Sequence, residues 1–157
     1  MKKITLTKGE GEGSTLLSAF DAALFDAGIA NYNLIHLSSI IPTGFQIVVK
    51  KPNINQSEFG KKLYVVIAER RENEIGKEAW AGIGWVLKND NSGEGLFVEH
   101  VGTTKEDVDN EIMSSLNDMK TRRQGNFGEI HSETIGVRCQ SKPVCALVAA
   151  VYGSESW

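Results

Sequence analysis

The chain has 157 residues, of which 41% are hydrophobic and 24% charged, with a formal net charge of −3. This composition is typical of a single globular domain with a hydrophobic core, and the slightly acidic balance gives no reason to expect nucleic-acid binding. No apolar run reaches the length that spans a membrane, and the first residues lack the apolar segment of a signal peptide, so we expect a cytoplasmic protein.

The N-terminal stretch predicts a strand followed by a glycine-rich turn. Residues 2–7 alternate between polar and apolar side chains, which is typical of a strand with one buried face. The turn is predicted from Gly9 to Gly13. It does not fit a phosphate-binding loop, because no Gly-Lys-Ser/Thr sequence follows and its two glutamates would repel phosphate.

Residues 14–27 predict the first helix, with Ser14 as its N-cap and Gly28 at the point where it stops. The predicted apolar stripe consists of Leu16, Leu17, Phe20, Leu24 and Ala27. Asp21 lies on the flank of this stripe. It is either a solvated residue at the edge or a ligand for a cation, and the pattern alone favours the solvated residue.

Two adjacent serines follow the next apolar segment. Residues 31–37 predict a strand buried on both faces, and Pro42 begins the turn that ends it. Held at such a junction, the Ser39 hydroxyl can attack the Ser38 carbonyl one peptide unit away, because fixed geometry gives an intramolecular reaction a large effective molarity. From the two serines alone, an ordinary strand-to-turn junction is the more frequent explanation.

Alternation places Asn33 on the same face of this strand as Ser39, and His36 on the opposite face. A buried amide at Asn33 needs hydrogen-bond partners, which a neighbouring loop can supply. Alternatively, its N–H groups can stabilise the oxyanion that forms when Ser39 attacks. We predict a structural role for His36.

Further strands are predicted at residues 45–50, 63–69 and 81–86. Gly82 and Gly84, in the last of these, indicate a close approach of neighbouring backbone.

Residues 95–101 predict a strand in which Glu99 shares a face with Phe97 and Val101. If this face is buried, the carboxyl group loses solvation, which favours its protonated form and suits a general acid. An exposed edge strand with Glu99 facing water fits the pattern equally well.

The C-terminal part predicts a helix and two strands. Residues 103–124 predict the second helix, with a capping box formed by Thr103 and Glu106. Its predicted buried stripe consists of Val108, Ile112, Leu116 and Met119. Strands follow at 129–137 and 144–152, and the second is apolar enough to be central in a sheet.

The sequence from Gly9 to Pro42 resembles the pyruvoyl-dependent arginine decarboxylases. The matching motifs are Gly-Glu-Gly (11–13), Ala19-Phe20-Asp21-x-Ala23-Leu24, Ala27-Gly28-Ile29, Asn31-x-Asn33-Leu34, Ser38-Ser39-Ile40-Ile41-Pro42 and, later, Gly95-Leu96-Phe97-Val98-Glu99 and Cys145-Ala146-Leu147-Val148-Ala149-Ala150. This resemblance implies an α+β fold over residues 1–157, arranged as a four-layer αββα sandwich.

The resemblance also implies that the chain cuts itself between Ser38 and Ser39. Residues 1–38 become a β fragment that stays bound to the α fragment, residues 39–157. Ser39 becomes a covalent pyruvoyl group, which takes the place of pyridoxal phosphate, forms a Schiff base with L-arginine and yields agmatine and CO2. No metal is expected, since the two cysteines have neither a second pair nor a histidine cluster beside them.

Matched position by position, the family implies a role for each candidate residue. Glu99 matches the proton donor, Asp21 the ligand of the arginine guanidinium, Asn33 a residue of processing and substrate contact, and Ser38 a substrate contact. A carboxylate suits a guanidinium because it accepts two parallel hydrogen bonds from the planar fork.

The resemblance implies a homotrimer, or a dimer of trimers, with active sites between subunits. The product places the activity in polyamine synthesis or in acid resistance. Two alternatives stay open, namely a pyruvoyl-dependent decarboxylase of another amino acid such as histidine, and an unprocessed oligomeric homologue without activity.

Overall fold

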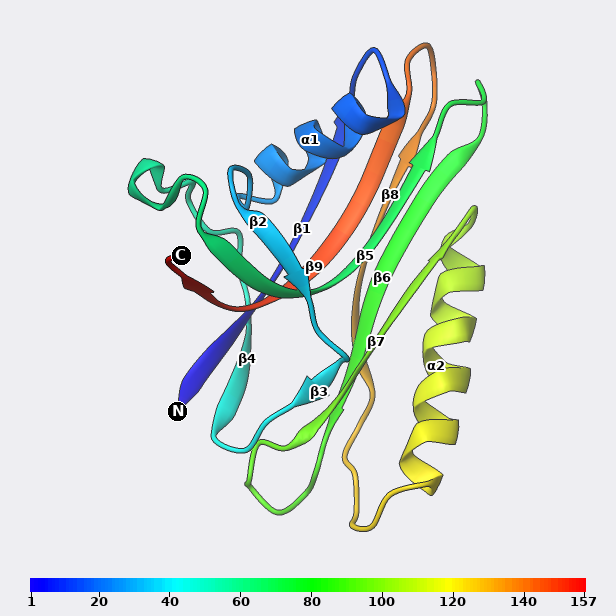
Figure 1. Cartoon of the computed structure of the whole chain (residues 1–157). Coiled ribbons are helices and arrows are strands. Elements are labelled where there is room, and N and C mark those ends of the chain that lie inside the picture. Colours follow the sequence, from blue (N-terminus) through cyan, green and yellow to red (C-terminus); the bar gives the residue numbers. More distant parts are fainter.

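The computed structural model describes all 157 residues, which form two helices and nine strands in two sheets (Figure 1). The elements are β1 (Lys2–Glu12), α1 (Leu16–Asp26), β2 (Asn33–His36), β3 (Ile40–Ile41), β4 (Phe45–Val49), the short 3-10 helix η1 (Gln56–Glu58), β5 (Lys62–Glu72), β6 (Glu78–Leu87), β7 (Gly95–Gly102), α2 (Lys105–Thr121), β8 (His131–Arg138) and β9 (Val144–Glu155).

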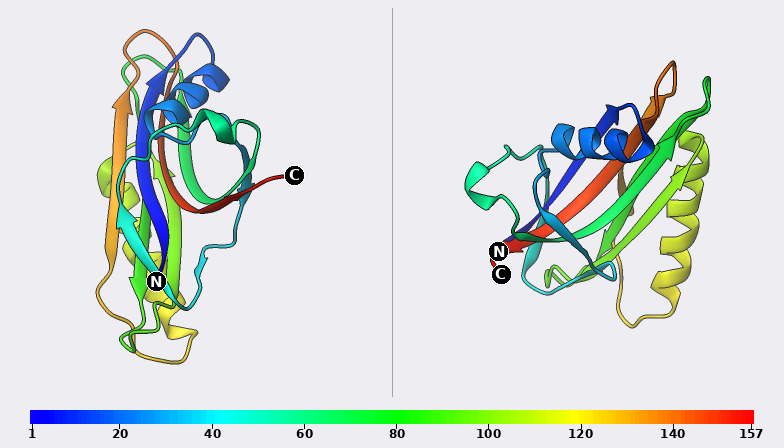
Figure 2. Two further views of the ribbon diagram at one scale, coloured as in Figure 1. Left: turned by 90° about the vertical axis from the view of Figure 1, so that its left-hand side faces the viewer. Right: turned by 45° about the horizontal axis from the view of Figure 1, so that its top comes forward.

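The two sheets pack face to face, and one helix covers each outer face. The first sheet has the strand order β2-β5-β9-β1-β4 and packs against α1, and the second has the order β3-β7-β6-β8 and packs against α2. Figure 2 shows the two helices on opposite sides of the paired sheets. The predicted α+β sandwich with four αββα layers is therefore confirmed.

The chain leaves the first sheet for the second between β2 and β3. The strand β2 pairs in parallel with β5, and β3 pairs antiparallel with β7. The three residues between them, 37–39, include both candidate serines. The predicted cleavage site thus lies where the chain crosses between the two sheets.

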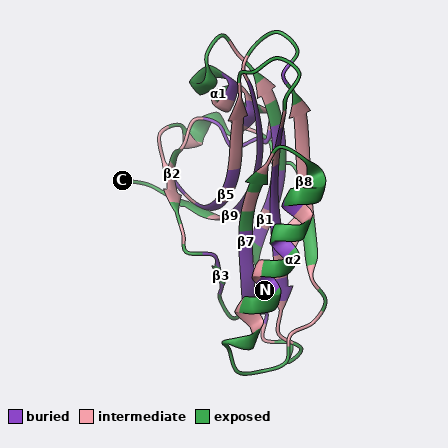
Figure 3. Ribbon diagram, turned by 90° about the vertical axis from the view of Figure 1, so that its right-hand side faces the viewer, coloured by how far each residue is buried: buried purple, intermediate pink, exposed green.

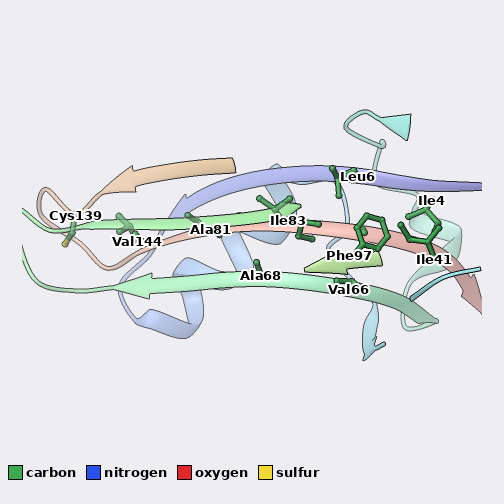
Figure 4. Close-up of a cluster of buried hydrophobic side chains, with 14 residues drawn as sticks. Ile4, Leu6, Ile41, Val66, Ala68, Ala81, Ile83, Phe97, Cys139 and Val144 are labelled. Carbon is green, nitrogen blue, oxygen red and sulfur yellow. The ribbon is translucent and has the colours of Figure 1, made fainter. Parts of the chain in front are cut away.

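Three buried clusters hold the layers together. The largest lies between the sheets, the second lies under α1, and the third lies under α2. Figure 3 shows buried residues along the strands and exposed residues over the outer face of α2. At one end of the largest cluster, Ile41 from β3 lies beside Phe97 from β7 and Ile4 from β1 (Figure 4).

The predicted turn from Gly9 to Gly13 is wrong, because β1 continues to Glu12. These glycines face α1 at very close range. A Cβ atom would lie 2.4 Å from the carbonyl oxygen of Ala23 at position 9, and 2.5 Å from the amide nitrogen of Ala23 at position 11. They stand in a strand because only a residue without a side chain lets the helix approach so closely.

Glycines also let α2 pack closely on the second sheet, but the atoms that approach Gly82 and Gly84 belong to side chains and not, as predicted, to neighbouring backbone. A Cβ atom on Gly84 would lie 2.2 Å from Cγ2 of Ile112, and one on Gly82 would lie 2.7 Å from Cγ1 of Val108.

The predicted stripe of the first helix is right in its second half only. Ala27 is buried, and Phe20 and Leu24 pack against the cluster under α1, but Leu16 is 37% exposed. Ala19 and Ala23 are fully buried, whereas Leu17 is 67% exposed, because the helix seats its small residues on the glycines of β1. Its N-cap is Thr15, whose side chain accepts a hydrogen bond from the Ser18 amide, and not Ser14.

The buried stripe of α2 is confirmed, but its cap is shifted by one residue. Val108, Ile112 and Leu116 are buried, and Met119 packs against them. The N-cap is Thr104, whose hydroxyl accepts from the Asp107 amide, so the predicted box of Thr103 and Glu106 is wrong.

The strand β2 lies at an edge of its sheet, so its predicted burial on both faces is wrong. Asn33 and His36 are exposed, and β5 is the only strand that pairs with β2. Its central residues, Leu34 and Ile35, are half-buried. Neither helix of the protein combines the length and the apolar character needed to cross a membrane.

Candidate active site

The structure brings Ser39 and Glu99 into direct contact. The Ser39 hydroxyl donates to the Glu99 carboxylate, with Oγ at 2.8 Å from Oε2 and 3.0 Å from Oε1. Ser39 is 8% exposed and immediately precedes β3, whereas Glu99 lies on the neighbouring strand β7. A carboxylate in this position can accept the hydroxyl proton when the serine acts as a nucleophile.

The backbone at Ser39 is in the left-handed region, with φ at 67°. Of the three non-glycine residues with positive φ, the other two are asparagines, which tolerate this region better than serine does. Such a conformation costs on the order of 1–3 kcal/mol and persists only where the surroundings enforce it. The angle φ turns about the bond that follows the Ser38–Ser39 peptide link, so the strain lies beside the predicted cleavage site.

Two hydrogen bonds fix the backbone that follows this residue. The amide of Phe97 donates to the Ser39 carbonyl at 2.9 Å, and the hydroxyl of Tyr152 donates to the Ile40 carbonyl at 2.8 Å. One donor belongs to β7 and the other to β9, so both sheets hold the segment in place.

Of the two arrangements that the pattern allowed for Glu99, the structure shows the exposed one. Phe97, two residues earlier on the same face, is fully buried, but Glu99 is exposed and Val101 is 43% exposed. The strand β7 leaves the cluster between the sheets along this stretch, so its second half faces solvent. Glu99 thus faces water, although β7 is not an edge strand: β3 pairs with its first residues, Gly95 and Leu96, and does not reach Glu99.

Tyr152 is a residue of this region that the sequence analysis did not identify. Its ring packs against Phe45 and Phe97, with ring centroids 6.4 Å and 6.2 Å away. Burial, together with the nearby charge of Glu99, raises the pKa of the Tyr152 phenol, so the hydroxyl stays protonated as a donor. A signal was present in the sequence, because this tyrosine carries the first hydroxyl in the apolar run of the last strand.

Asn33 and Ser38 do not join this contact. The Asn33 side chain is exposed and donates to the Gly60 carbonyl at 2.8 Å, as expected for a structural amide bonded to a neighbouring loop. Ser38 is exposed, and its hydroxyl makes no hydrogen bond within the chain.

Asp21 lies on the outer face of α1, away from Ser39. The helix packs on β1, β5 and β9, whereas β3 packs on β7, and Figure 1 shows α1 well separated from β3. The Asp21 carboxylate is exposed and has neither an ion-pair partner nor a hydrogen-bond partner in the chain. Leu17 and Phe25, one helical turn before and after it, are 67% and 46% exposed.

A pocket of about 260 Å³ lies beside β3. It is lined by Ile40, Ile41, Pro42, Thr43, Lys88, Glu94, Gly95, Leu96, Arg123 and Phe127. Neither Ser39 nor Glu99 nor Asp21 lines it. The structure contains no group of three or more metal-binding side chains, and Cys139 and Cys145 are buried free thiols.

Comparison with known proteins gives one consistent result. The family described as pyruvoyl-dependent arginine decarboxylase (PvlArgDC) matches residues 3–156. A pyruvoyl-dependent arginine decarboxylase of Thermococcus sibiricus is 32% identical over 151 residues, which cover 96% of this chain and 94% of the relative. One of Thermoplasma volcanium is 39% identical over 98 residues, which cover 62% of this chain and only 54% of the relative. One of Picrophilus torridus is 34% identical, again over 54% of its own length.

Proposed function

The chain belongs to the family of pyruvoyl-dependent arginine decarboxylases, and on this premise we propose that it converts L-arginine to agmatine and CO2. The observation that carries this proposal is the contact between the Ser39 hydroxyl and the Glu99 carboxylate at a backbone held in a strained conformation. A reactive serine needs an acceptor for its proton and a fixed approach to its target, and both are present here.

In the proposed self-cleavage, Ser39 Oγ attacks the Ser38 carbonyl carbon while Glu99 accepts the hydroxyl proton. The Ser38–Ser39 C–N bond then breaks, the Ser39 nitrogen takes up a proton, and an ester joins the two parts of the chain. Loss of the Ser39 Cα proton and rupture of its Cβ–Oγ bond release Ser38 as a carboxylate. The resulting enamine at residue 39 consumes one water and releases ammonia, so no oxidant or reductant is required.

The residues around Ser39 fit the pyruvoyl group that this sequence of steps yields. When present, the group supplies a ketone that condenses with the substrate amine and withdraws electrons as CO2 leaves. The Phe97 amide, which donates to the carbonyl oxygen of residue 39, favours negative charge on that oxygen. Glu99 contacts the side chain of residue 39, so it can hold the proton that replaces CO2.

We propose that Asp21 binds the guanidinium of arginine in a site shared between subunits of a homotrimer or a dimer of trimers. This proposal is supported by an exposed carboxylate without a partner, placed between the exposed apolar side chains of Leu17 and Phe25. Asn33 and Ser38, both exposed near the crossing between the sheets, are proposed as further substrate contacts. A cytoplasmic location stays a prediction.

The test is the intact mass of the purified protein under denaturing conditions. We expect two species, residues 1–38 and residues 39–157, with a ketone in place of the amine at the start of the larger one. The Ser39→Ala variant, which lacks the nucleophile, should give a single species near 17.2 kDa. A wild-type chain that stays intact would contradict the proposal and favour an unprocessed homologue, and turnover of histidine rather than arginine would overturn the substrate.

A further inference from the structure

A β-bulge in the last strand sets Tyr152 apart from its neighbours. Along β5 and β9, Val65 faces Val151, but the preceding residue Tyr64 faces Gly153. Tyr152 is therefore the extra residue, with no partner opposite it on β5. Bulges of this kind bend a strand and re-aim a side chain, and they are frequent beside active sites.

The side chain of Tyr152 spans the space between the two sheets. It starts from β9 in the first sheet, its ring contacts Phe97 of the second sheet, and its hydroxyl reaches the Ile40 carbonyl on β3 at 2.8 Å. No other side chain donates a hydrogen bond to the backbone of residues 38–41.

We propose that Tyr152 is a positioning residue for self-cleavage, which fixes the segment after Ser39 so that its strained backbone persists until the chain is cut. The inference rests on the proposed function. The Ile40 carbonyl is one residue beyond the strained φ, so a donor bound to it resists the rotation that would let Ser39 relax. Phe97 holds the preceding carbonyl in the same way, from the backbone.

The hydroxyl, rather than the ring, carries this role. Burial and the charge of Glu99 raise the pKa of the Tyr152 phenol, so it donates over the whole physiological pH range. The ring contributes packing that a phenylalanine would keep. Tyr152→Phe therefore removes the donor with little change in volume.

The experiment follows the rate at which freshly refolded precursor is cut, as the mass fraction of residues 39–157 over time. Two control variants separate positioning from general stability. Tyr64→Phe removes another tyrosine hydroxyl bound to an acceptor, Glu155, on the neighbouring strand. Phe45→Leu weakens the packing against the Tyr152 ring and leaves its hydroxyl in place. Thermal midpoints are measured in the Ser39→Ala background, where no chain is cut.

We expect Tyr152→Phe to slow cleavage about tenfold, the upper range for loss of one hydrogen bond, with both controls within about twofold of wild type. Cleavage of Tyr152→Phe at the wild-type rate would overturn the inference. The inference would also be overturned if Phe45→Leu slowed cleavage as much as Tyr152→Phe does and the two variants had the same thermal midpoint. The slowing would then reflect a general loss of stability and not the loss of the hydroxyl. If the wild-type chain is never cut, the proposed function itself is wrong. If the wild-type chain is cut, the comparison of the variants tests only the role of Tyr152.

Discussion

Two regions of the molecule differ in whether their polar groups find hydrogen-bond partners within the same chain. At the junction of β3 and β7, Ser39 has its proton acceptor, its carbonyl has a donor, and the next carbonyl has another donor. On the outer face of α1, Asp21 has no partner at all and stands between exposed apolar side chains.

This difference separates two tasks. The proposed cleavage is an intramolecular reaction, and the groups that we assign to it lie on elements of the same chain. In the proposed substrate site, the Asp21 carboxylate stays free until it binds the guanidinium of arginine. The comparison predicts that substitutions in the first region affect cleavage or chemistry, while those in the second affect substrate binding.

The largest effect is expected from Glu99→Gln. The amide oxygen still accepts the Ser39 hydrogen bond but can neither take up nor supply a proton. Cleavage should therefore slow, and decarboxylation per pyruvoyl group should fall about 10²–10⁴-fold. The measurement is agmatine formation, normalised to the mass fraction of cut chain. Undiminished turnover by this variant would remove Glu99 from the chemistry.

A smaller effect, confined to substrate binding, is expected from Asp21→Ala. The variant should be cut like wild type and raise KM for arginine about 10- to 100-fold, because one charge-assisted interaction is lost. Asp118→Ala, which removes an exposed acid from α2, is the matched control and should leave KM unchanged. Unchanged arginine turnover by Asp21→Ala would contradict the assignment of Asp21 to the guanidinium. The division of the molecule into a cleavage region and a substrate-binding region would then be wrong.

Gly11→Ala tests whether the close packing of α1 on β1 holds Asp21 in the position that substrate binding requires. The added Cβ would lie 2.5 Å from helix backbone, so the helix must shift, at a cost of about 1–3 kcal/mol in unfolding free energy. KM should rise more than the cleavage rate falls. Gly153→Ala, where no atom lies within 4 Å of the new Cβ, is the control, and denaturant unfolding of both variants gives the comparison.

The smallest expected effect concerns pH and the C-terminal end of α1. Partial burial raises the pKa of Asp26, but the Glu10 amide and the Lys51 ammonium bound to it lower that pKa further, so the net shift is downward. The stabilisation is therefore complete above the unfolded value near 3.8 and is lost as pH falls through the folded value.

Asp26→Asn should thus lower the thermal midpoint at neutral pH, by less than Gly11→Ala does, since exposed ion pairs contribute at most about 1 kcal/mol. The difference from wild type should shrink as the pH falls below about 4. A difference that stays constant down to pH 2 would show that this carboxylate does not help to anchor the helix through its charge.

Much of the fold follows from local pattern, and the failures have a common physical cause. The buried stripe of α2 was predictable because it keeps the helical periodicity, and the apolar run of β9 was predictable because residues 144–150 are buried without interruption. The strand at Gly9 and Gly11 was not predictable, because these glycines are required by the close packing of α1, which follows them in the chain. Local pattern therefore predicts an element where periodicity is regular, but it cannot predict a residue that is required by contact with a distant element.

The candidate site divides in the same way. Ser39 and Glu99 were identified from their motifs and do meet, but alternation along β7 could not tell where the strand leaves the core. The hydrogen bond from Tyr152 to the Ile40 carbonyl joins residues 112 positions apart in the chain. The positive φ of Ser39 is enforced by contacts with the distant strands β7 and β9. The positive φ leaves no mark on the local sequence, and the one signal for Tyr152 is its hydroxyl, the first in the apolar run of β9.

The position of β1 determines how the protein would refold after the cleavage that we propose. This strand lies inside the first sheet, between β9 and β4, and both of those neighbours come from beyond residue 39. The two pieces can separate only if that sheet opens, so their dissociation is as slow as global unfolding. Assembly of the precursor is a first-order process, whereas recovery of the cut protein from denaturant requires two chains to meet and becomes second order in concentration. The proposed cleavage would therefore make recovery of the native state depend on protein concentration, which the folding of the uncut chain does not.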